Sequence, residues 1–166
     1  EFCRKNIFEP LEMYDTYWML SDIQHNNIAS PHTINDQGHT ILPHYGYASY
    51  PDGQIRTTHL DYLKFMEAFM KTSEKQVKTL LKPVIIKESL KISQEEVNKW
   101  QALGWHYNSL FDEDFYQDVP HLPGHTGGDP GVSTTVFFDP YRRSAVVLFL
   151  NIRVNNEETQ QARLAI

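Results

Sequence analysis

The run Gly124-His125-Thr126-Gly127-Gly128-Asp129-Pro130-Gly131 holds the residue types that are best suited to chemistry. His125 carries an imidazole whose charge can change near neutral pH, and Thr126 adds a hydroxyl. Gly127 and Gly128 have no Cβ, so a substrate can approach the backbone closely there. Acyl transfer needs a nucleophile, a base and amide donors aimed at the developing oxyanion. Such a run can supply an amide donor.

Two other uses of this run are excluded by its residues. It is not a phosphate-binding loop, because it lacks the Gly-Lys-Ser/Thr ending and no strong helix follows it. His121 and His125 have the spacing of two zinc ligands on a helix, but Pro123 and Gly124 lie between them and forbid that helix. The plain structural alternative is a tight hairpin with a solvent-facing histidine.

The run is flanked by segments that predict antiparallel strands. Residues 119–128 are suited to an extended backbone, and Asp129-Pro130-Gly131 indicates a turn. Residues 132–138 are β-branched and aromatic, as strands are, and 139–142 form a second turn. Residues 144–151 are apolar on both faces, which predicts a central strand covered on both sides.

Helices are predicted before this meander. Thr58 and Asp61 have the spacing of a capping box at the start of a helix. The apolar residues that recur at helical spacing, and that we expect in the core, are Leu60, Leu63, Met66, Phe69 and Met70. Ser73 begins a second helix that Pro83 should stop, and Ser93 begins a short third one.

The remaining segments complete an α+β arrangement. Residues 2–13 indicate the end of a helix broken at Pro10, and residues 14–53 a long irregular stretch. Residues 105–110 have strand composition, with Trp105 expected in the core. A last helix begins at Asn155. Helices, then an antiparallel meander, then a helix that packs back on it define the predicted fold class, α+β.

Three segments together resemble the serine β-lactamases, the D-alanyl-D-alanine peptidases and related esterases. His125-Thr126-Gly127 and the strands after it resemble the third motif region, where many members have Lys-Thr-Gly. Residues 6–13, with Asp15-Thr16, resemble the segment that follows the second motif. Residues 50–58, with Asp61-Tyr62-Leu63, resemble the bend into a helix. The matches follow the family order over nearly the whole chain, and they imply a β-lactamase/transpeptidase-like fold.

The resemblance also implies a site. The family's nucleophile lies in Ser-x-x-Lys, and a second motif is Tyr-x-Asn or Ser-x-Asn; residues 1–166 contain none of these. Both motifs would precede residue 7, so we expect residues 1–166 to be the C-terminal portion of one domain, inactive alone. On the family pattern His125, Thr126 and Gly127 edge the active site, and the Gly128 N–H is one oxyanion donor.

A histidine in place of lysine bears on the substrate. Lysine is charged at neutral pH, whereas an ordinary histidine is mostly neutral, so His125 should hold an anionic substrate weakly or in a pH-dependent way. Peptidase or esterase chemistry on a small-molecule or peptide substrate is therefore favoured over efficient β-lactamase activity. The alternative is a non-catalytic peptide-binding protein of the same fold.

Two groups in the stretch 14–53 are further candidates. Three tyrosines could line a substrate cleft or pack the loop onto the body; they are Tyr45, Tyr47 and Tyr50. Three histidines accompany Asp36, and they are His32, His39 and His44. Their spacing fits no strong zinc signature and Cys3 is the only cysteine, so we expect neither a metal nor another cofactor.

Composition and the resemblance together bound the partners. Fifteen Lys and Arg against 21 Asp and Glu give a net charge of −6, which argues against a nucleic-acid surface. No apolar run approaches the ~20 residues that span a bilayer. The resemblance implies export to a bacterial periplasm or cell surface. The two-sided apolar strand needs cover from the missing N-terminal part, so we also expect self-association of these residues alone.

Overall fold

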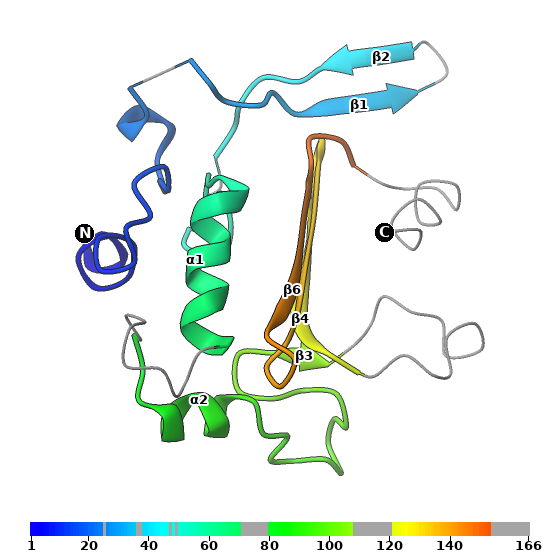
Figure 1. Cartoon of the computed structure of the whole chain (residues 1–166). Coiled ribbons are helices and arrows are strands. Elements are labelled where there is room, and N and C mark those ends of the chain that lie inside the picture. Colours follow the sequence, from blue (N-terminus) through cyan, green and yellow to red (C-terminus); the bar gives the residue numbers. More distant parts are fainter. Residues whose placement is uncertain are drawn as a thin grey trace.

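The computed structural model describes residues 1–24, 26–35, 38–46, 48, 50–70, 80–107 and 121–153. Within these ranges, helix α1 (His59–Met70) lies along one face of an antiparallel sheet, and the N-terminal segment lies on the far side of α1 (Figure 1). The order of layers is therefore N-terminal segment, helix, sheet. This arrangement confirms the predicted α+β class with a C-terminal antiparallel meander.

The sheet has four strands in the order β3-β4-β5-β6, all antiparallel. They are β3 (His106–Tyr107), β4 (Pro123–Asp129), β5 (Val132–Asp139) and β6 (Ser144–Leu150). Pro130 and Gly131 connect β4 to β5, and Gly131 has φ +74°, which glycine adopts without steric cost. Both predicted turns and the strands around them are confirmed.

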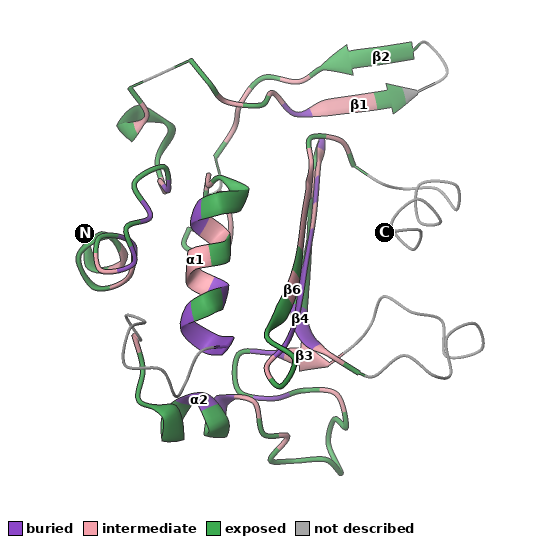
Figure 2. Ribbon diagram, viewed as in Figure 1, coloured by how far each residue is buried: buried purple, intermediate pink, exposed green. Residues whose placement is uncertain are grey.

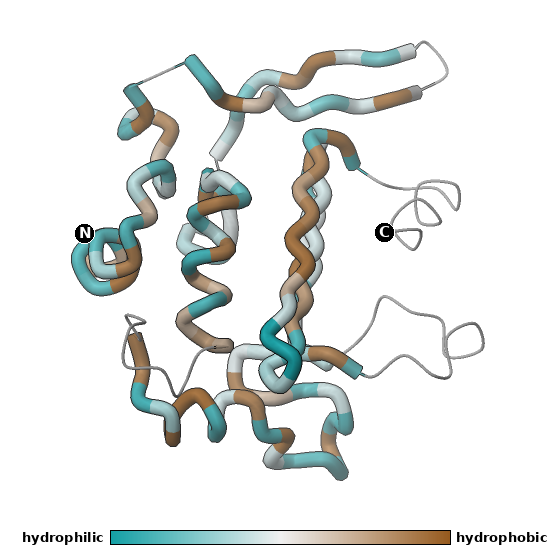
Figure 3. The backbone as a smooth tube through the Cα atoms, viewed as in Figure 1, coloured by the Kyte–Doolittle hydropathy of each residue, from teal (hydrophilic) through white to brown (hydrophobic). Residues whose placement is uncertain are grey.

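The prediction of a central position for the last strand is wrong for the described sheet. Strand β6 pairs with β5 and is the outermost strand, although its residues are hydrophobic along its length (Figure 3). Ala145, Val147 and Phe149 pack toward α1. Val146, on the opposite face, is 50% exposed. An apolar pattern on both faces thus indicates what a strand can bury, and it does not fix which strands flank it.

Helix α1 begins as predicted, because the Asp61 N–H donates to the Thr58 hydroxyl at 3.2 Å. Met66, Phe69 and Met70 are buried. Leu60 and Leu63, however, are 73% and 37% exposed, so the expected core positions of these two residues are wrong. The adjacent aromatic stripe turns toward the sheet instead: Tyr62 lies edge-on to Phe149, with 5.7 Å between ring centroids. An aromatic ring buries more apolar area than a leucine side chain, which explains why the aromatic face of α1 packs on the sheet.

The main core lies between α1 and the sheet. Phe138 of β5 is fully buried, and its ring contacts Trp105 at 4.8 Å and Phe69 at 6.4 Å between centroids. Figure 2 shows the buried residues concentrated at the C-terminal end of α1 and along the sheet. Trp105 is 6% exposed, which confirms its expected core position. These contacts fix the chain just before β3.

Two local predictions in the N-terminal half need correction or refinement. The opening residues form a π-helix, Arg4–Phe8, that ends before Pro10. The stretch 14–53 is not irregular throughout, because it contains a short helix, Leu20–Asp22, and a two-stranded ribbon. The ribbon consists of β1 (His32–Asn35) and β2 (Gly38–Ile41). Its apolar side chains are exposed, so the strands show no buried alternating face that sequence could indicate.

One helix prediction fails and another is only partly described. Pro83 is the first residue of α2 (Pro83–Ser89), where its missing N–H is harmless; the helix that it was expected to stop falls on residues 71–79, outside the described residues. Ser93 begins no helix. Residues 94–98 form a single turn in which the Gln94 carbonyl accepts from two N–H groups, and Val97 is 75% exposed. Without a buried stripe, a capping signal alone does not sustain a helix.

Several predictions lie outside the described residues. They are the helix start at Ser73, the strand end at residues 108–110, and the last helix from Asn155.

Two half-buried tyrosines, Tyr62 and Tyr107, have a raised pKa. Burial raises the pKa of Tyr62 above its ordinary value of 10.0. Burial, and then repulsion by Tyr141, raises the pKa of Tyr107. The Tyr107 hydroxyl donates to the Leu90 carbonyl at 2.7 Å, which ties β3 to the end of α2.

Candidate active site

Strand β4 has one edge that is only partly paired. It pairs with β5 from Gly124 to Asp129, but with β3 only at Pro123 and Gly124. Within the described ranges, the edge from His125 onward has no neighbouring strand. The residues from His125 to Gly128 are exposed. A hollow of about 270 Å³ opens beside this edge. Its lining residues are Gln101, His106, Gly124, His125, Thr126 and Phe137.

The register indicates which peptide groups face the free edge. Asp129 and Val132 flank a two-residue turn, so they form a hydrogen-bonded pair. Hydrogen-bonded and non-hydrogen-bonded pairs alternate along an antiparallel pair of strands. The N–H of Gly127 therefore points toward β5, whereas the N–H groups of Gly128 and Thr126 point away from it. The Gly128 N–H therefore points away from β5, toward the part of the β4 edge that no described strand pairs with, as an oxyanion donor must.

His125 is held at this edge by a turn just before β3. Its Nε2 lies 2.7 Å from the Gly104 carbonyl oxygen. Its ring lies 5.7 Å from that of Trp105, between centroids, at a tilt of 37°. Thr126 is on the opposite face of β4 and lines the hollow with Phe137. The predicted residues 125–128 are therefore brought together at one exposed edge.

The glycines of β4 differ in the space around them. A Cβ on Gly124 would lie 2.1 Å from the Val136 carbonyl oxygen, and one on Gly127 would lie 2.5 Å from the Thr134 hydroxyl oxygen. A Cβ on Gly128 would meet only the Arg153 guanidinium, at 3.7 Å. Packing thus explains the first two glycines, whereas Gly128 has room for a side chain. Its bare backbone is not required by the fold around it.

The three tyrosines do not act as one group. The Tyr45 hydroxyl donates to the Pro130 carbonyl at 2.6 Å, beside the β4–β5 turn. Tyr50 packs edge-on against Trp18, with 5.3 Å between centroids, so it packs the loop onto the body rather than standing free. Tyr47 lies outside the described residues.

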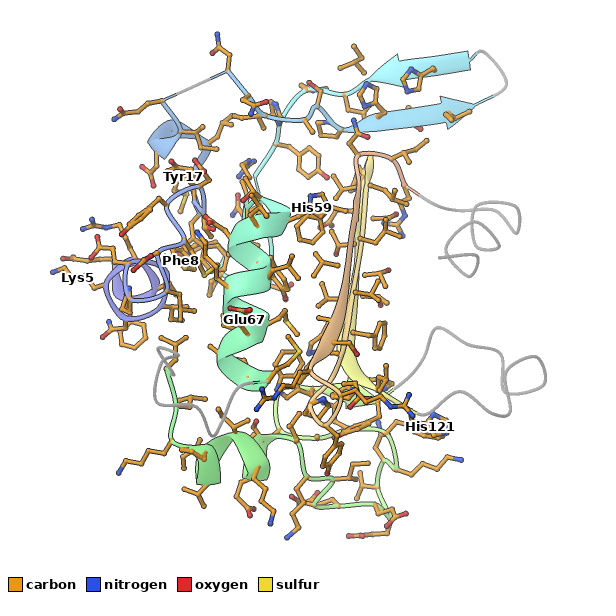
Figure 4. The ribbon with its side chains drawn as sticks, in the orientation of Figure 1. Lys5, Phe8, Tyr17, His59, Glu67 and His121 are labelled. Atoms are coloured by element: carbon orange, nitrogen blue, oxygen red, sulfur yellow. The ribbon has the colours of Figure 1, made fainter. Side chains whose placement is uncertain are left out.

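Two of the loop histidines, His32 and His39, contact each other, and His32 also contacts Asn151, the residue after β6. The rings of His32 and His39 stack 4.5 Å apart, and His32 Nδ1 lies 3.0 Å from Asn151 Nδ2. His121 lies at the other end of the molecule, against Trp100 (Figure 4). Among the described residues, no three His, Cys, Asp or Glu side chains gather as they would around a metal ion.

Some residues at the hollow were not identified from the sequence. Gln101 and His106 line it, and Gly104 supplies the carbonyl that contacts His125. Gly104 has φ +80°, which favours glycine, so a turn there could have been predicted. Gln101 carries no signal, because only the pairing of β3 with β4 brings it near the site.

A buried aspartate joins the two upstream segments that the sequence singled out. Asp61, which is 3% exposed, accepts hydrogen bonds from the Asp15 N–H at 2.7 Å and the Thr16 hydroxyl at 3.1 Å. Its other oxygen lies 2.7 Å from Lys64 Nζ, which also donates to the Glu12 carbonyl. The segments thus form one structural unit on the side of α1 away from the sheet.

No helix among the described residues is long and apolar enough to cross a bilayer. A search of curated proteins gave no match to this sequence.

Solved structures of penicillin-binding proteins share the fold. The octameric penicillin-binding protein homologue from Pyrococcus abyssi is 17% identical, with TM-score 0.69, over 99% of this chain and 36% of that one. The penicillin-binding protein from Bacillus halodurans is 19% identical, with TM-score 0.69, over 99% and 48%. The D-alanine carboxypeptidase AmpC from Burkholderia cenocepacia is 20% identical, with TM-score 0.65, over 95% and 51%.

The chain spans between about a third and a half of each of these proteins. At such identities the likeness establishes the fold alone. A model of the β-lactamase family matches residues 1–166. The match extends over every segment that carried the resemblance, and the chain belongs to the β-lactamase family.

Proposed function

We propose that residues 1–166 form the C-terminal portion of a serine hydrolase that cleaves an amide or ester through an acyl-enzyme. The observation that carries the proposal is the exposed edge of β4, where the Gly128 N–H points away from β5 and where His125 and Thr126 line a hollow of about 270 Å³. Family membership supports the reaction class. The structural neighbours include a protein described as a D-alanine carboxypeptidase.

Each residue at the edge has a distinct role in this proposal. The Gly128 N–H and the N–H of the nucleophilic serine donate to the oxyanion of the tetrahedral intermediate. Thr126 offers its hydroxyl to a carbonyl or carboxylate of the substrate. His125 takes the position at which relatives have lysine, and it holds a neutral substrate better than an anionic one. The serine and its lysine come from a segment upstream of residue 1.

Acylation tests the proposal directly. The intact protein should gain the mass of one fluorophosphonate or penicillin adduct on a serine, because the nucleophile and the β4 edge then face each other. Residues 1–166 alone should gain no mass, and should not hydrolyse p-nitrophenyl acetate above the buffer rate. Mass spectrometry after limited digestion locates the adduct. Stoichiometric labelling of residues 1–166 alone would contradict the placement of the nucleophile.

Replacement of Gly128 by valine should reduce turnover of the intact protein more than its stability. The local space accepts a Cβ, since the nearest atom is the Arg153 guanidinium at 3.7 Å, so the free energy of unfolding should change by less than about 1 kcal/mol. The branched side chain restricts the backbone approach of the substrate, and kcat/KM should fall about 100-fold. Steady-state kinetics and urea unfolding measure the two effects. Unchanged kcat/KM places the oxyanion site elsewhere.

A non-catalytic peptide-binding protein is the second candidate. The free edge of β4 can accept an extended peptide as an added strand, whether or not a serine is present. In that case the residue at the nucleophile position upstream is not serine, and the intact protein binds a peptidoglycan-like peptide without acylation. Calorimetry with such a peptide, beside the labelling experiment, separates the two candidates.

We also expect residues 1–166 alone to self-associate, and the intact protein to be exported to a bacterial periplasm or cell surface. Val146 on the outer face of β6 is 50% exposed, and one structural neighbour is described as octameric. Buried apolar area stabilises association by about 25 cal/mol per Å². The sedimentation coefficient should therefore rise with concentration, and a Val146→Thr variant should shift this rise to higher concentration. A monomer at all concentrations contradicts the expectation.

A further inference from the structure

We propose that the backbone carbonyl of Gly104 is a positioning group for His125. It holds the imidazole in the tautomer with hydrogen on Nε2, which leaves Nδ1 as a hydrogen-bond acceptor for an N–H or O–H group of the substrate. The proposal deepens the proposed function and rests on it, since it specifies what His125 offers at the β4 edge.

The contact between His125 and Gly104 determines the tautomer. Nε2 and the carbonyl oxygen are 2.7 Å apart. A carbonyl oxygen can only accept, so Nε2 must carry the hydrogen, and in the neutral ring Nδ1 then has the free lone pair. Among the described residues, Nδ1 has no hydrogen-bond partner. The side chain is exposed and lines the hollow, so Nδ1 remains accessible.

The carbonyl is itself held by a well-supported turn. The Ala102 N–H donates to the Trp105 carbonyl at 2.9 Å, which closes a two-residue turn around Gly104. The Gln101 side-chain amide donates to the carbonyls of Ala102 at 2.9 Å and Trp105 at 3.1 Å. Buried Trp105 anchors the turn against Phe69 and Phe138. The position of the carbonyl therefore depends on the backbone turn, on the Gln101 amide and on the packing of Trp105.

Gly104 matters for its backbone conformation rather than for space. Its φ is +80°, and a Cβ there would meet nothing within 4 Å. A Gly104→Ala variant thus adds no clash, but an L-residue disfavours this φ, and the peptide should rotate. The carbonyl would then leave His125. The variant thus changes the backbone conformation at residue 104 without a steric clash, so it tests the position of the carbonyl alone.

The fixed tautomer has a consequence for substrate class. A lysine at position 125 could only donate, and would attract a carboxylate. In the tautomer set by the Gly104 carbonyl, His125 instead presents an acceptor next to Thr126 in the sequence, whose hydroxyl can donate or accept. The site therefore favours a substrate that places an amide N–H or a hydroxyl here, rather than a terminal carboxylate.

Nitrogen NMR of the intact protein at alkaline pH, where imidazole is neutral, tests the proposal without reference to activity. The expected spectrum of His125 shows hydrogen on Nε2 and none on Nδ1. Gly104→Ala should give a mixture of tautomers. Gln101→Glu should do the same, because its carboxylate cannot donate to the turn; Gln94→Glu, an exposed residue with the same change, is the control. A wild-type Nδ1–H tautomer, or identical spectra in both variants, overturns the proposal.

Kinetics separate this proposal from the proposed function. Gly104→Ala should raise KM about tenfold for an amide substrate that offers an N–H donor, the loss of one hydrogen bond, and should leave the rate of fluorophosphonate labelling within about twofold. An equal effect on both reactions contradicts positioning. If the tautomer is as expected but no serine is labelled in the wild type, the proposed hydrolase function fails and the positioning of His125 stands.

Discussion

Replacement of Gly124 by alanine should destabilise the protein by about 3 kcal/mol, at the upper end of the cost of overpacking. The added Cβ would lie 2.1 Å from the Val136 carbonyl oxygen and 2.4 Å from the Phe137 ring. The oxygen belongs to the β4–β5 ladder, so it cannot move without loss of strand pairing. Gly124 also pairs with His106 of β3, so both neighbours restrain β4 at this point.

The matched control is Gly128→Ala on the same strand. Its Cβ would meet the nearest atom at 3.7 Å, an ordinary contact distance. Its free energy of unfolding should stay within about 0.5 kcal/mol of the wild type. Urea unfolding followed by circular dichroism compares the two variants. Equal stability of Gly124→Ala and Gly128→Ala would show that β4 does not lie against β5 as described.

Loss of the Asp61 carboxylate should have an effect of similar size. Asp61→Ala removes the acceptor of the Asp15 N–H and of the Thr16 hydroxyl at a buried site, where the Thr16 hydroxyl keeps its contact with the Thr57 hydroxyl at 2.8 Å. Hydrogen bonds to a charged acceptor contribute about 1.5–3 kcal/mol each. Because Lys64 can turn to solvent, we expect a net loss of about 3 kcal/mol.

Two further variants make the Asp61 prediction specific. Asp61→Asn keeps the shape but presents an amide N–H₂ to one of its donor neighbours, so it should recover less than half of the loss. Glu88→Ala removes an exposed carboxylate on α2 and should change stability by less than about 0.5 kcal/mol. Thermal unfolding of all three variants is the measurement. An Asp61→Ala variant as stable as Glu88→Ala would contradict a structural role for the buried carboxylate.

The sequence predicted the elements whose signals are local. Residues 132–138 are β-branched and aromatic, and the turns at Pro130 and Asp139 have side chains or glycines that fix their conformation, so the bounds predicted for β5 and β6 are within one residue of those observed. Strand β4 begins at Pro123, later than the predicted start at residue 119. The Asp139 carboxylate accepts from the N–H groups of Tyr141 and Arg142, at 2.8 and 2.9 Å, as an aspartate in a turn should.

What the sequence could not predict depends on tertiary contacts. Helix α1 has an aliphatic and an aromatic stripe, and either could have faced the sheet. The aromatic stripe packs against the sheet, and Leu60 is therefore exposed. Ribbon β1–β2 has no buried face to produce a pattern. At the site, the residue types of 125–128 were evident, but the free edge and the Gly104 contact follow from the register of β3 against β4. No local pattern specifies that register.

The central claim is that the Gly128 N–H faces the reacting carbonyl, and an amide-to-ester exchange tests it most directly. Glycolic acid in place of Gly128 removes this N–H and adds no side chain; the same exchange at Gly127 removes an N–H directed toward β5. We predict that the exchange at 128 slows acylation of the intact protein at least 100-fold with little loss of stability. The exchange at 127 should lower stability and leave the acylation rate nearly unchanged. Acylation at the wild-type rate after the exchange at 128 would contradict the account.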